Sequence, residues 1–500
     1  MRALVIDLNN FSRYPTLSVG YLTSVLRTNQ IDVDILSPFA KGVAGYPRLT
    51  QARRRELYLN FLKHWTAVTP NKTLKRIRKI IQQIFHPGGS EDKKVILEYL
   101  DELLNNTPDV VLISAYTMYY DISYAIGEIC QQRGIPVIIG GSAFVHPEVA
   151  ALWHNIPGVS AVYAGEPEPH LISLINDVLA GKDISAYRGL YKPTQQMVDV
   201  APPLVALDQL PFPDFSDFPW HAYPNKVIPL MTGRGCEWDI CTFCSDVSSA
   251  SGRTFRSRSI ENVIDEMRFQ SAQFATKLFV FLDLKLNSDL FLWRELIERI
   301  PKEFPNALWT ASIHVDSRMD NGLSKADLQK AAKAGLVRIT CGLESGSARM
   351  LKQMAKGIKL DRLSRFLQDA HEAGISVRMT AIIGYPGEEV ADVDLTTEFI
   401  AKHTPYIERI MLNRFTLMPK TPISQQLANN SDKYPEFSIK QFDVNSATIS
   451  HSNTKLSTRS YYWAAFRLMK AVHGINKNLN TLLQENLKVL CKSIACLKNN

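Results

Sequence analysis

Short apolar runs alternate with amphipathic segments in the first part of the chain. Runs rich in Val and Ile predict strands at Leu4–Asp7, Ile31–Leu36, Val110–Ser114, Val137–Gly140 and Val159–Ala164. Helical spacing of apolar residues predicts helices at Ser18–Thr28, Ile122–Arg133 and His170–Ala180. Because alternating strands and helices are typical of a parallel sheet covered on both faces, residues 1–200 are expected to form a doubly wound, Rossmann-like α/β domain.

A second series of such units follows a proline-rich bridge at residues 201–225. It predicts strands at Val227–Met231, Lys277–Asp283, Leu308–Ile313, Val337–Leu343, Ser376–Ile383 and Ile410–Phe415, and helices at Ser259–Phe274, Lys325–Ala334, Ala348–Lys356 and Asp361–Ala373. Repeated βα units over residues 226–422 favour a partial (β/α)6 TIM barrel, whose functional residues lie at the carboxyl ends of the strands. Residues 423–500 are expected to be mostly helical, with helices at Tyr461–Val472, ended by Gly474, and at Leu479–Leu497.

An insertion at residues 41–106 separates the second and third strands of the first domain. Within it, Lys72–His86 carries apolar residues at helical spacing and basic residues on the remaining face. Lys41 to Pro87 contains eleven Lys or Arg and one acid, Glu56, a surplus that exceeds the net charge of +8 of the whole chain. A capping helix with a solvated basic face and a docking surface for an acidic partner both fit this pattern.

The composition is that of a globular protein with more than one domain. The chain has 500 residues, of which 45% are hydrophobic and 21% charged. Its apolar runs fall short of the ~18 residues that cross a bilayer, so no membrane span is expected. The first seven residues are typical of a strand rather than a signal peptide, and a cytoplasmic, reducing location is therefore expected.

Three cysteines, Cys236, Cys241 and Cys244, lie close together after the first strand of the second series. Three thiolates can hold three corners of an iron–sulfur cube and leave one iron without a protein ligand. A structural zinc site needs four ligands, and no fourth Cys or His lies nearby at zinc-finger spacing. A disulfide framework needs an even number of cysteines and a secreted chain. The three cysteines therefore predict a [4Fe–4S] cluster.

This segment resembles the signature of the radical S-adenosylmethionine (SAM) superfamily, Cys-x3-Cys-x2-Cys with an aromatic residue before the last Cys. Phe243 holds the aromatic place, while the first gap has four residues, as in members with a Cys-x-Trp-x-x-Cys loop. The resemblance implies that the open iron binds the amino and carboxylate groups of SAM. It also implies that an electron from a donor such as flavodoxin or ferredoxin cleaves SAM to methionine and a 5′-deoxyadenosyl radical.

Three predicted strand ends resemble segments of the same family, in family order. They are Leu282-Asp283, with Leu284 where the family has a second aspartate, Gly342 to Ser347, and Ile383 to Glu388. The resemblance places Phe243 near SAM, Asp283, Glu344 and Ser345 near its amino or ribose groups, and the backbone of Ile383 and Gly384 near its adenine. A carboxylate can pair with the ammonium of SAM, and glycine admits close backbone approach.

The first domain resembles the cobalamin-binding domain that precedes many radical SAM domains. The matching segments are Pro15 to Leu22, Gly140-Gly141 followed by His146-Pro147, and Gly165-Glu166. The resemblance implies a corrin near Gly140, Gly141, Ser142, Gly165 and Glu166. Because the Asp-x-His-x-x-Gly motif is absent, cobalamin would be bound without a histidine ligand from the protein. The alternative to cobalamin binding is an inherited fold that has lost the cofactor.

Two reactions are compatible with this set of motifs. One is cobalamin-dependent methyl transfer to an unactivated carbon of a natural product, in the manner of class B radical SAM methyltransferases. The other is epimerisation of a ribosomal peptide, in which a Cys returns hydrogen to Cα. The donor candidates are Cys130, Cys341, Cys491 and Cys496, although Cys341 should face away from Glu344 because strand side chains alternate.

The substrate is expected to be a small molecule or a peptide, with an acidic peptide fitting the basic insertion. A nucleic-acid substrate is not expected, because the tRNA methylthiotransferases of the family carry extra N-terminal cysteines and residues 1–129 contain none. A cobalamin or iron–sulfur sensor is the non-enzymatic alternative, and it would not need the SAM-contacting strand ends.

Overall fold

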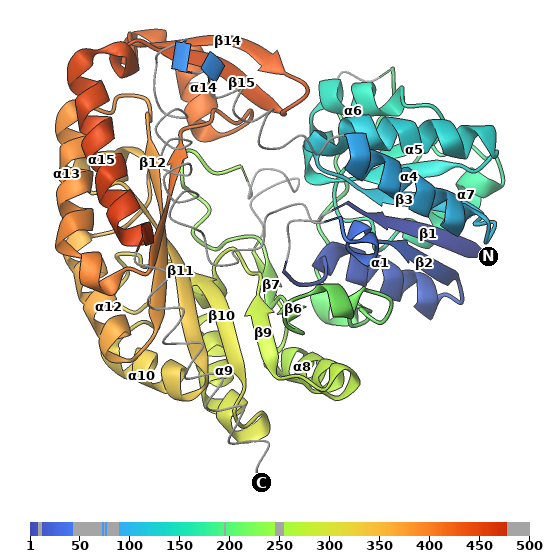
Figure 1. The fold of residues 1–500 in the computed structure, drawn as a ribbon, viewed down its shortest axis with the longest axis horizontal. Helices are drawn as coiled ribbons and strands as arrows, with labels where there is room; N and C mark the ends of the chain where they lie inside the picture. The colour runs from blue at the N-terminus through green and yellow to red at the C-terminus, as the bar shows by residue number, and fades with distance from the viewer. Residues whose placement is uncertain are drawn as a thin grey trace.

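The computed structural model describes residues 1–8, 13–43, 73–74, 76–77, 90–194, 197–245 and 255–477. Two predictions, most of the Lys72–His86 helix and the Leu479–Leu497 helix, lie outside the described residues, as do Cys491 and Cys496. The described chain forms a five-stranded parallel sheet, a six-stranded parallel sheet and a C-terminal hairpin (Figure 1).

The first sheet has the order β2-β1-β3-β4-β5 and confirms the predicted Rossmann-like fold. Its strands are β1 (Arg2–Asp7), β2 (Asp32–Leu36), β3 (Val110–Ser114), β4 (Val137–Gly140) and β5 (Val159–Tyr163). Alternate residues enter separate cores: Val5 packs with residues of α1 and α7, and Ile6 with residues of α4 and α6. The helices are α1 (Leu17–Thr28), α4 (Ser90–Leu104), α5 (Tyr120–Gln132), α6 (Pro147–His154) and α7 (Leu171–Leu179).

The second sheet has the order β13-β12-β11-β10-β9-β6, so β13 and β6 are its edges and the barrel is open. Its strands are β6 (Ile228–Leu230), β9 (Leu278–Phe281), β10 (Leu308–Ile313), β11 (Leu336–Glu344), β12 (Ser376–Ile383) and β13 (Arg409–Arg414). The helices α8 (Ile260–Phe274), α9 (Leu290–Glu303), α10 (Lys325–Lys333), α11 (Ala348–Gln353), α12 (Leu360–Glu372) and α13 (Val390–Lys402) connect them. The partial (β/α)6 prediction is confirmed.

Side chains of the barrel strands alternate between a buried outer face and a more accessible inner face. In β12, Val377 and Met379 are buried in the core shared with α12, whereas Arg378 and Thr380 are only partly buried. Residues with hydroxyl groups continue this inner face on β10 and β11, namely Thr310, Ser312 and Thr340. The barrel therefore presents a polar interior below its carboxyl edge.

The C-terminal region differs from the prediction in two respects. Besides α14 (Pro422–Asn429) and α15 (Arg459–Lys477), it contains an antiparallel hairpin of β14 (Phe437–Asp443) and β15 (Thr448–Asn453). In addition, α15 does not end at Gly474. The helix continues because Asn476 bonds to both the N–H and the C=O of Ile410 on the edge strand β13, each at 2.9 Å.

Contacts between the two α/β units come from several parts of the chain. Ala447 and Phe442 of the hairpin pack against the core of the first unit, and Lys420 donates to the carbonyl of Val145 just beyond β4. In the bridge, the ring of Phe215 fills the space beside Gly20 of α1, where a Cβ would lie 2.4 Å from it. The bridge is also bonded at its start, where the Ala201 N–H donates to the Ala164 carbonyl at 3.0 Å, and at Pro213, whose carbonyl accepts from Gln270 at 2.6 Å. No helix among the described residues is long and apolar enough to cross a membrane.

Candidate active site

The loop that carries the three cysteines begins at a buried carboxylate. Asp283, just after β9, accepts hydrogen bonds from the N–H groups of Thr232 and Gly233 and from the Thr232 hydroxyl, at 2.7–3.1 Å. Burial raises the pKa of Asp283 to about 6, although these hydrogen bonds act in the opposite direction. Asp283 therefore holds the start of the cysteine loop. Its carboxylate oxygens already accept hydrogen bonds from Thr232 and Gly233, and its predicted contact with SAM stays a prediction.

The middle of the loop is fastened through Trp238. Its indole N–H donates to the carbonyl of Ala355 at 3.0 Å, and its ring lies against Gly357. A Cβ at Gly357 would come within 1.8 Å of the Trp238 ring, and the φ of +68° at this residue also favours glycine. Gly357, on the turn between α11 and α12, therefore leaves the space that the ring of Trp238 occupies.

The end of the loop is fastened to α11 and to the turn after β12. The Thr242 N–H donates to the carbonyl of Met354 at 3.0 Å, and the Thr242 and Tyr385 hydroxyls lie 2.7 Å apart. Phe243, expected near SAM, is partly buried against a small core that contains Tyr385, and the Lys356 Nζ lies 5.7 Å from the centroid of its ring. The loop is thus fixed at both ends and in the middle before any ligand binds.

The three cysteines are partly exposed and lie near one another. Burial and the neighbouring Cys244 and Cys236 raise the pKa of the Cys241 thiol to about 11, so ionisation requires a compensating positive charge such as iron. In the described part of the chain, no three Cys, His, Asp or Glu residues converge on one metal ion. A cube places each cysteine on a different iron and needs no such convergence, so this donor set fits the expected cluster.

Glu344, the residue expected to bind the amino group of SAM, faces the cysteine loop from the end of β11. Its carboxylate pairs with the Lys356 Nζ at 3.0 Å and accepts a hydrogen bond from Thr380 at 3.2 Å. A Cβ at Gly342 would lie 2.1 Å from Glu344 Oε1, so this glycine leaves room for the ion pair. Burial lowers the pKa of Lys356, but Glu344 and Cys241 outweigh it and keep the ammonium charged.

The other strand-end residues expected near SAM are bonded within the chain. The Ser345 hydroxyl is buried 3.2 Å from the Thr396 hydroxyl of α13. The Ile383 carbonyl accepts from the Phe415 N–H at 2.8 Å, and the Gly384 N–H donates to Glu388 at 2.7 Å. Glu388 also accepts a hydrogen bond from Tyr461 of α15. These residues shape the turns around Glu344, and their predicted contacts with ribose and adenine stay predictions.

Cys341 lies on the outer face of β11, next to Ile339 and Leu343 in the hydrophobic core. Burial raises the pKa of its thiol to about 12. Its face is opposite to that of Gly342, as the alternation of strand side chains predicts. A hydrogen donor must be protonated and must also reach the substrate; the Cys341 thiol points into packed side chains on the outer face of the barrel, which does not favour this role. Cys130 is likewise buried, on α5.

The residues expected near cobalamin lie at the carboxyl ends of β4 and β5, and they differ in how accessible they are to a ligand. A Cβ at Gly140 would meet only the Tyr163 carbonyl, at 3.9 Å, and Ser142 is exposed, so this turn is accessible to a ligand. By contrast, a Cβ at Gly141 would lie 2.3 Å from the Ala115 carbonyl, and Gly165, with a φ of +112°, packs closely on Ala201. These last two glycines are required by the fold itself.

Glu166, also expected near cobalamin, instead forms an ion-pair cluster between the two units, which we call the interdomain clasp. Arg234, two residues before Cys236, pairs with Glu166 at 3.0 Å and with Glu168 at 2.6 Å. Arg256 pairs with Glu166 at 2.8 Å from the neighbouring strand of the β7 (Gly233–Arg234) and β8 (Arg256–Ser257) ribbon. The clasp holds the cysteine loop against the carboxyl end of β5.

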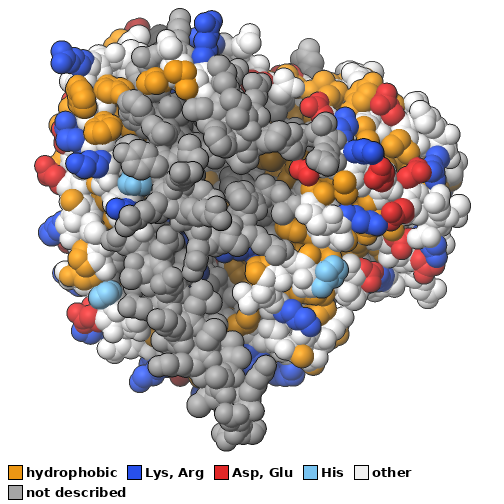
Figure 2. Space-filling view, viewed as in Figure 1, with side chains coloured by type: hydrophobic (Ala, Val, Ile, Leu, Met, Phe, Trp, Pro, Cys, Tyr) orange, Lys and Arg blue, Asp and Glu red, His pale blue; other side chains and the backbone are white. Residues whose placement is uncertain are grey.

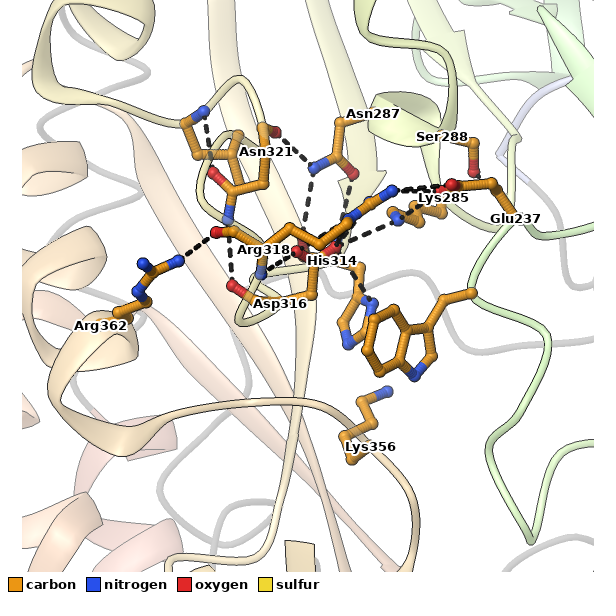
Figure 3. Close-up of polar contacts among 12 residues, drawn as sticks. Glu237, Lys285, Asn287, Ser288, His314, Asp316, Arg318, Asn321, Lys356 and Arg362 are labelled. Carbon is orange, nitrogen blue, oxygen red and sulfur yellow. Dashed lines mark hydrogen bonds and ion pairs between the residues drawn. The ribbon is translucent and has the colours of Figure 1, made fainter. Parts of the chain in front are cut away.

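Several residues near the cysteine loop were not predicted from the sequence. Lys285, His314 and Asp316 follow β9 and β10 and gather beside Glu237 and Arg318 (Figure 3). Burial and the nearby Lys356 and Lys285 lower the pKa of His314 to about 3, which keeps its imidazole neutral. Their place directly after predicted strands was a usable signal, because functional residues of such barrels lie there.

Charged side chains are mixed on the described surface that faces the viewer in Figure 2. Over the Rossmann-like unit, basic and acidic side chains alternate without a field of one sign. The basic stretch from Lys41 to Pro87 lies almost entirely outside the described residues, so its role as a docking surface stays a prediction.

Comparison with known proteins agrees with this geometry. Residues 230–400 match the radical SAM superfamily. An uncharacterised methyltransferase of Pyrococcus horikoshii is 28% identical over 59% of this chain and 64% of its own length. Bacteriochlorophyllide d C-12(1)-methyltransferase of Chlorobaculum tepidum is 27% identical over 67% of this chain and 69% of its own.

A solved structure shares the arrangement of both units. The radical SAM methyltransferase TsrM from Kitasatospora setae, with cobalamin and a [4Fe–4S] cluster bound, superposes with a TM-score of 0.67 over 94% of this chain and 91% of that one. At 16% sequence identity, this likeness shows a common fold. The family match covers the cysteine loop and the strand ends that surround it. Residues 230–400 of this chain therefore form a domain of the radical SAM superfamily.

Proposed function

We propose that this protein cleaves SAM at a [4Fe–4S] cluster held by Cys236, Cys241 and Cys244, and that it transfers a methyl group by way of cobalamin to a carbon of a small-molecule or peptide natural product. The observation that carries the proposal is the interdomain clasp. Arg234 precedes the cysteines by two residues and binds Glu166 and Glu168 just past β5. The cluster loop and the ligand edge of the Rossmann-like unit are thereby neighbours.

The residues around the loop suit SAM. When bound, the cluster supplies the electron that cleaves SAM to methionine and a 5′-deoxyadenosyl radical. Glu344 would pair with the ammonium of SAM, while Lys356 and Thr380 orient the Glu344 carboxylate. Phe243 and Trp238 pack beside the cysteines and exclude water from the reacting end of SAM.

The first unit suits a corrin at the turn after β4. Cobalamin, when bound, would supply a carrier for the methyl group that a second molecule of SAM donates. Gly140 leaves the backbone accessible, Ser142 is exposed, and the apolar side chains of Tyr116 and Met118 after β3 are 46% and 71% exposed. Exposed apolar side chains beside an open backbone are what a large flat ring requires. That two relatives and one structural neighbour are methyltransferases supports this choice.

The barrel interior indicates the kind of substrate. Ser312, Thr340 and Thr380 face inward below the carboxyl edge, where they can bond to polar groups of a substrate held with one carbon near SAM. We propose a polar natural product, with an acidic peptide as one form. A flavodoxin or ferredoxin would supply the electron.

Cofactor content and product mass test the proposal. Protein reconstituted without oxygen should carry four irons and one corrin per chain. With methyl-labelled SAM, the product of a candidate substrate should be heavier by one labelled methyl group. Two results together would refute methyl transfer and favour epimerisation. The first is protein that carries a cluster but no corrin. The second is a product whose mass is unchanged in ordinary water and which gains one deuterium when the reaction is run in heavy water.

A further inference from the structure

Four charged side chains join the cysteine loop to the ends of two barrel strands, and we call them the loop anchor. Arg318 binds both carboxylate oxygens of Glu237, at 2.7 and 2.6 Å, and pairs with Asp316 at 2.7 Å (Figure 3). The Lys285 Nζ lies 3.3 Å from both Glu237 and Asp316. Each cation of the anchor thus contacts both of its carboxylates.

The anchor and Trp238 both fasten the Cys-x4-Cys gap of the loop. Glu237 directly follows Cys236, so its bonds act on the backbone of the first cysteine. The next residue, Trp238, is held by the Ala355 carbonyl and fills the space over Gly357, and its ring centroid lies 5.3 Å from that of His314, beside the anchor. Glu237 and Trp238, two neighbouring residues of the gap, are thus each bonded to residues at the mouth of the barrel.

Burial makes the charges of the anchor interdependent. The Lys285 and Asp316 side chains are 1% and 0% exposed, whereas Glu237 is 40% exposed. Two cations balance two anions, and loss of one buried charge leaves its partner uncompensated in a medium that solvates it poorly. Asp316 is further fixed by the N–H of Arg318 at 3.0 Å. The anchor residues that follow the barrel strands, Lys285 and Asp316, are therefore held firmly in place. Glu237 is the anchor residue that belongs to the cysteine loop.

We propose that the loop anchor is a positioning device for the iron–sulfur cluster, built on the proposed function. Through Glu237 it fixes Cys236 at its corner of the cube, and its balanced charges set the electrostatic potential at that corner. These residues act through Cys236 and do not themselves touch iron or SAM.

Iron retention and reduction potential test the anchor in the full-length, reconstituted protein. Glu237→Gln keeps the shape of the side chain and removes its charge. It should release iron to a chelator about tenfold faster, because a charge-assisted hydrogen bond to Arg318 is weakened. It should also raise the midpoint potential of the cluster, since a negative charge is lost. Lys285→Gln should lower that potential, since a positive charge is lost.

Arg294→Gln is the matched control. Arg294 of α9 pairs at 2.8 Å with Asp320, which lies in the same loop after β10 as Asp316 and Arg318. The Arg294 and Asp320 side chains are 43% and 56% exposed. Its loss should change neither iron release nor potential. If Glu237→Gln does not fold, Arg318→Lys replaces it: the charge stays, the paired contact with Glu237 is lost, and iron should leave faster at an unchanged potential.

Two results would overturn the anchor while the proposed function stands. One is wild-type iron release and potential in Glu237→Gln. The other is a shift of the potential in the same direction for Glu237→Gln and Lys285→Gln, which would indicate general disruption rather than charge balance. Wild-type protein that takes up no iron would overturn the proposed function and the anchor with it.

Discussion

The interdomain clasp should contribute measurably to stability through the pair of Arg234 and Glu168. These side chains are 13% and 8% exposed and lie 2.6 Å apart. Replacing Arg234 with Met leaves the Glu168 carboxylate buried and unpaired, while Glu166 keeps Arg256. Breaking a buried ion pair by removing one partner costs about 3–5 kcal/mol. Because neither side chain is wholly buried, we expect a cost of about 3 kcal/mol.

A double-mutant cycle isolates this pair from the rest of the clasp. Arg234→Met and Glu168→Gln, singly and together, should give a coupling energy of about 2 kcal/mol or more. Urea unfolding followed by tryptophan fluorescence measures it. Cleavage of the bridge at residues 201–225 by a protease serves as a second probe, because a chain of two units need not unfold in one step.

The exposed pair of Arg188 and Asp199 is the control for this cycle. The two side chains lie 3.1 Å apart but are 55% and 50% exposed, so their coupling should fall below about 1 kcal/mol. A coupling of Arg234 with Glu168 no larger than that of the control would refute the reasoning. The clasp would then be one contact among many and could not hold the cluster loop against β5.

Three further changes test the two cofactor sites and the turn after β12. Cys241→Ala should lose the cluster and abolish SAM cleavage, whereas Cys341→Ala, in the core, should keep both; full 5′-deoxyadenosine production by Cys241→Ala would contradict the assignment. Gly140→Ala should keep the wild-type melting temperature but lose corrin absorbance, while Gly141→Ala, 2.3 Å from the Ala115 carbonyl, should be destabilised by about 1–3 kcal/mol. Corrin binding unchanged in Gly140→Ala would move the ring elsewhere. Burial raises the pKa of Glu388 from 4.5 to about 7, so its stabilisation is present below pH 4.5 and lost as the pH rises through 7. Glu388→Gln should remove this fall of roughly 3 kcal/mol, and an unaltered pH profile of melting would contradict it.

The predicted strands were found because buried parallel strands have a local signature. Each strand of the first sheet contributes side chains to cores on both faces and therefore appears in the sequence as a continuous apolar run. The barrel strands bury only alternate residues, and their signature is the apolar outer face. The hairpin of β14 and β15 lacked this signature, because most side chains of β14 are exposed. Its pairing depends on packing against the first unit through Ala447 and Phe442, which no local pattern reveals.

Helix α9 was missed although its signal was present. Leu292, Trp293, Leu296, Ile297 and Ile300 recur at helical spacing, and all are buried. The end of α15, unlike α9, could not be located from local sequence. Gly474 is a plausible stop signal, and only the contact of Asn476 with the edge strand β13 carries the helix past it.

The cysteines were predictable because their chemistry depends on spacing within one short loop. The roles of Asp283 and Glu166 were not, because their partners lie far away in the sequence. Asp283 binds Thr232, 51 residues earlier, and Glu166 binds Arg256, 90 residues later. Motif resemblance predicts that both carboxylates lie beside the cofactors, and these contacts stay predictions. The structure shows that Asp283 bonds to the backbone of Thr232 and that Glu166 pairs with Arg256.

The contacts between the two units are spread so that each restrains a different movement. Arg234 fixes the end of β5, Lys420 binds just beyond β4, and Arg27 of α1 pairs with Asp214 of the bridge at 2.7 Å. A rotation that relieves one of these contacts strains the other two. Since the clasp acts on the residues that lead into Cys236, the separation of the cluster loop from the turn at Gly140 is set by side chains already in place. In the proposed reaction, the cysteine loop and the turn at Gly140 would therefore face each other without first assembling the interface between the two units.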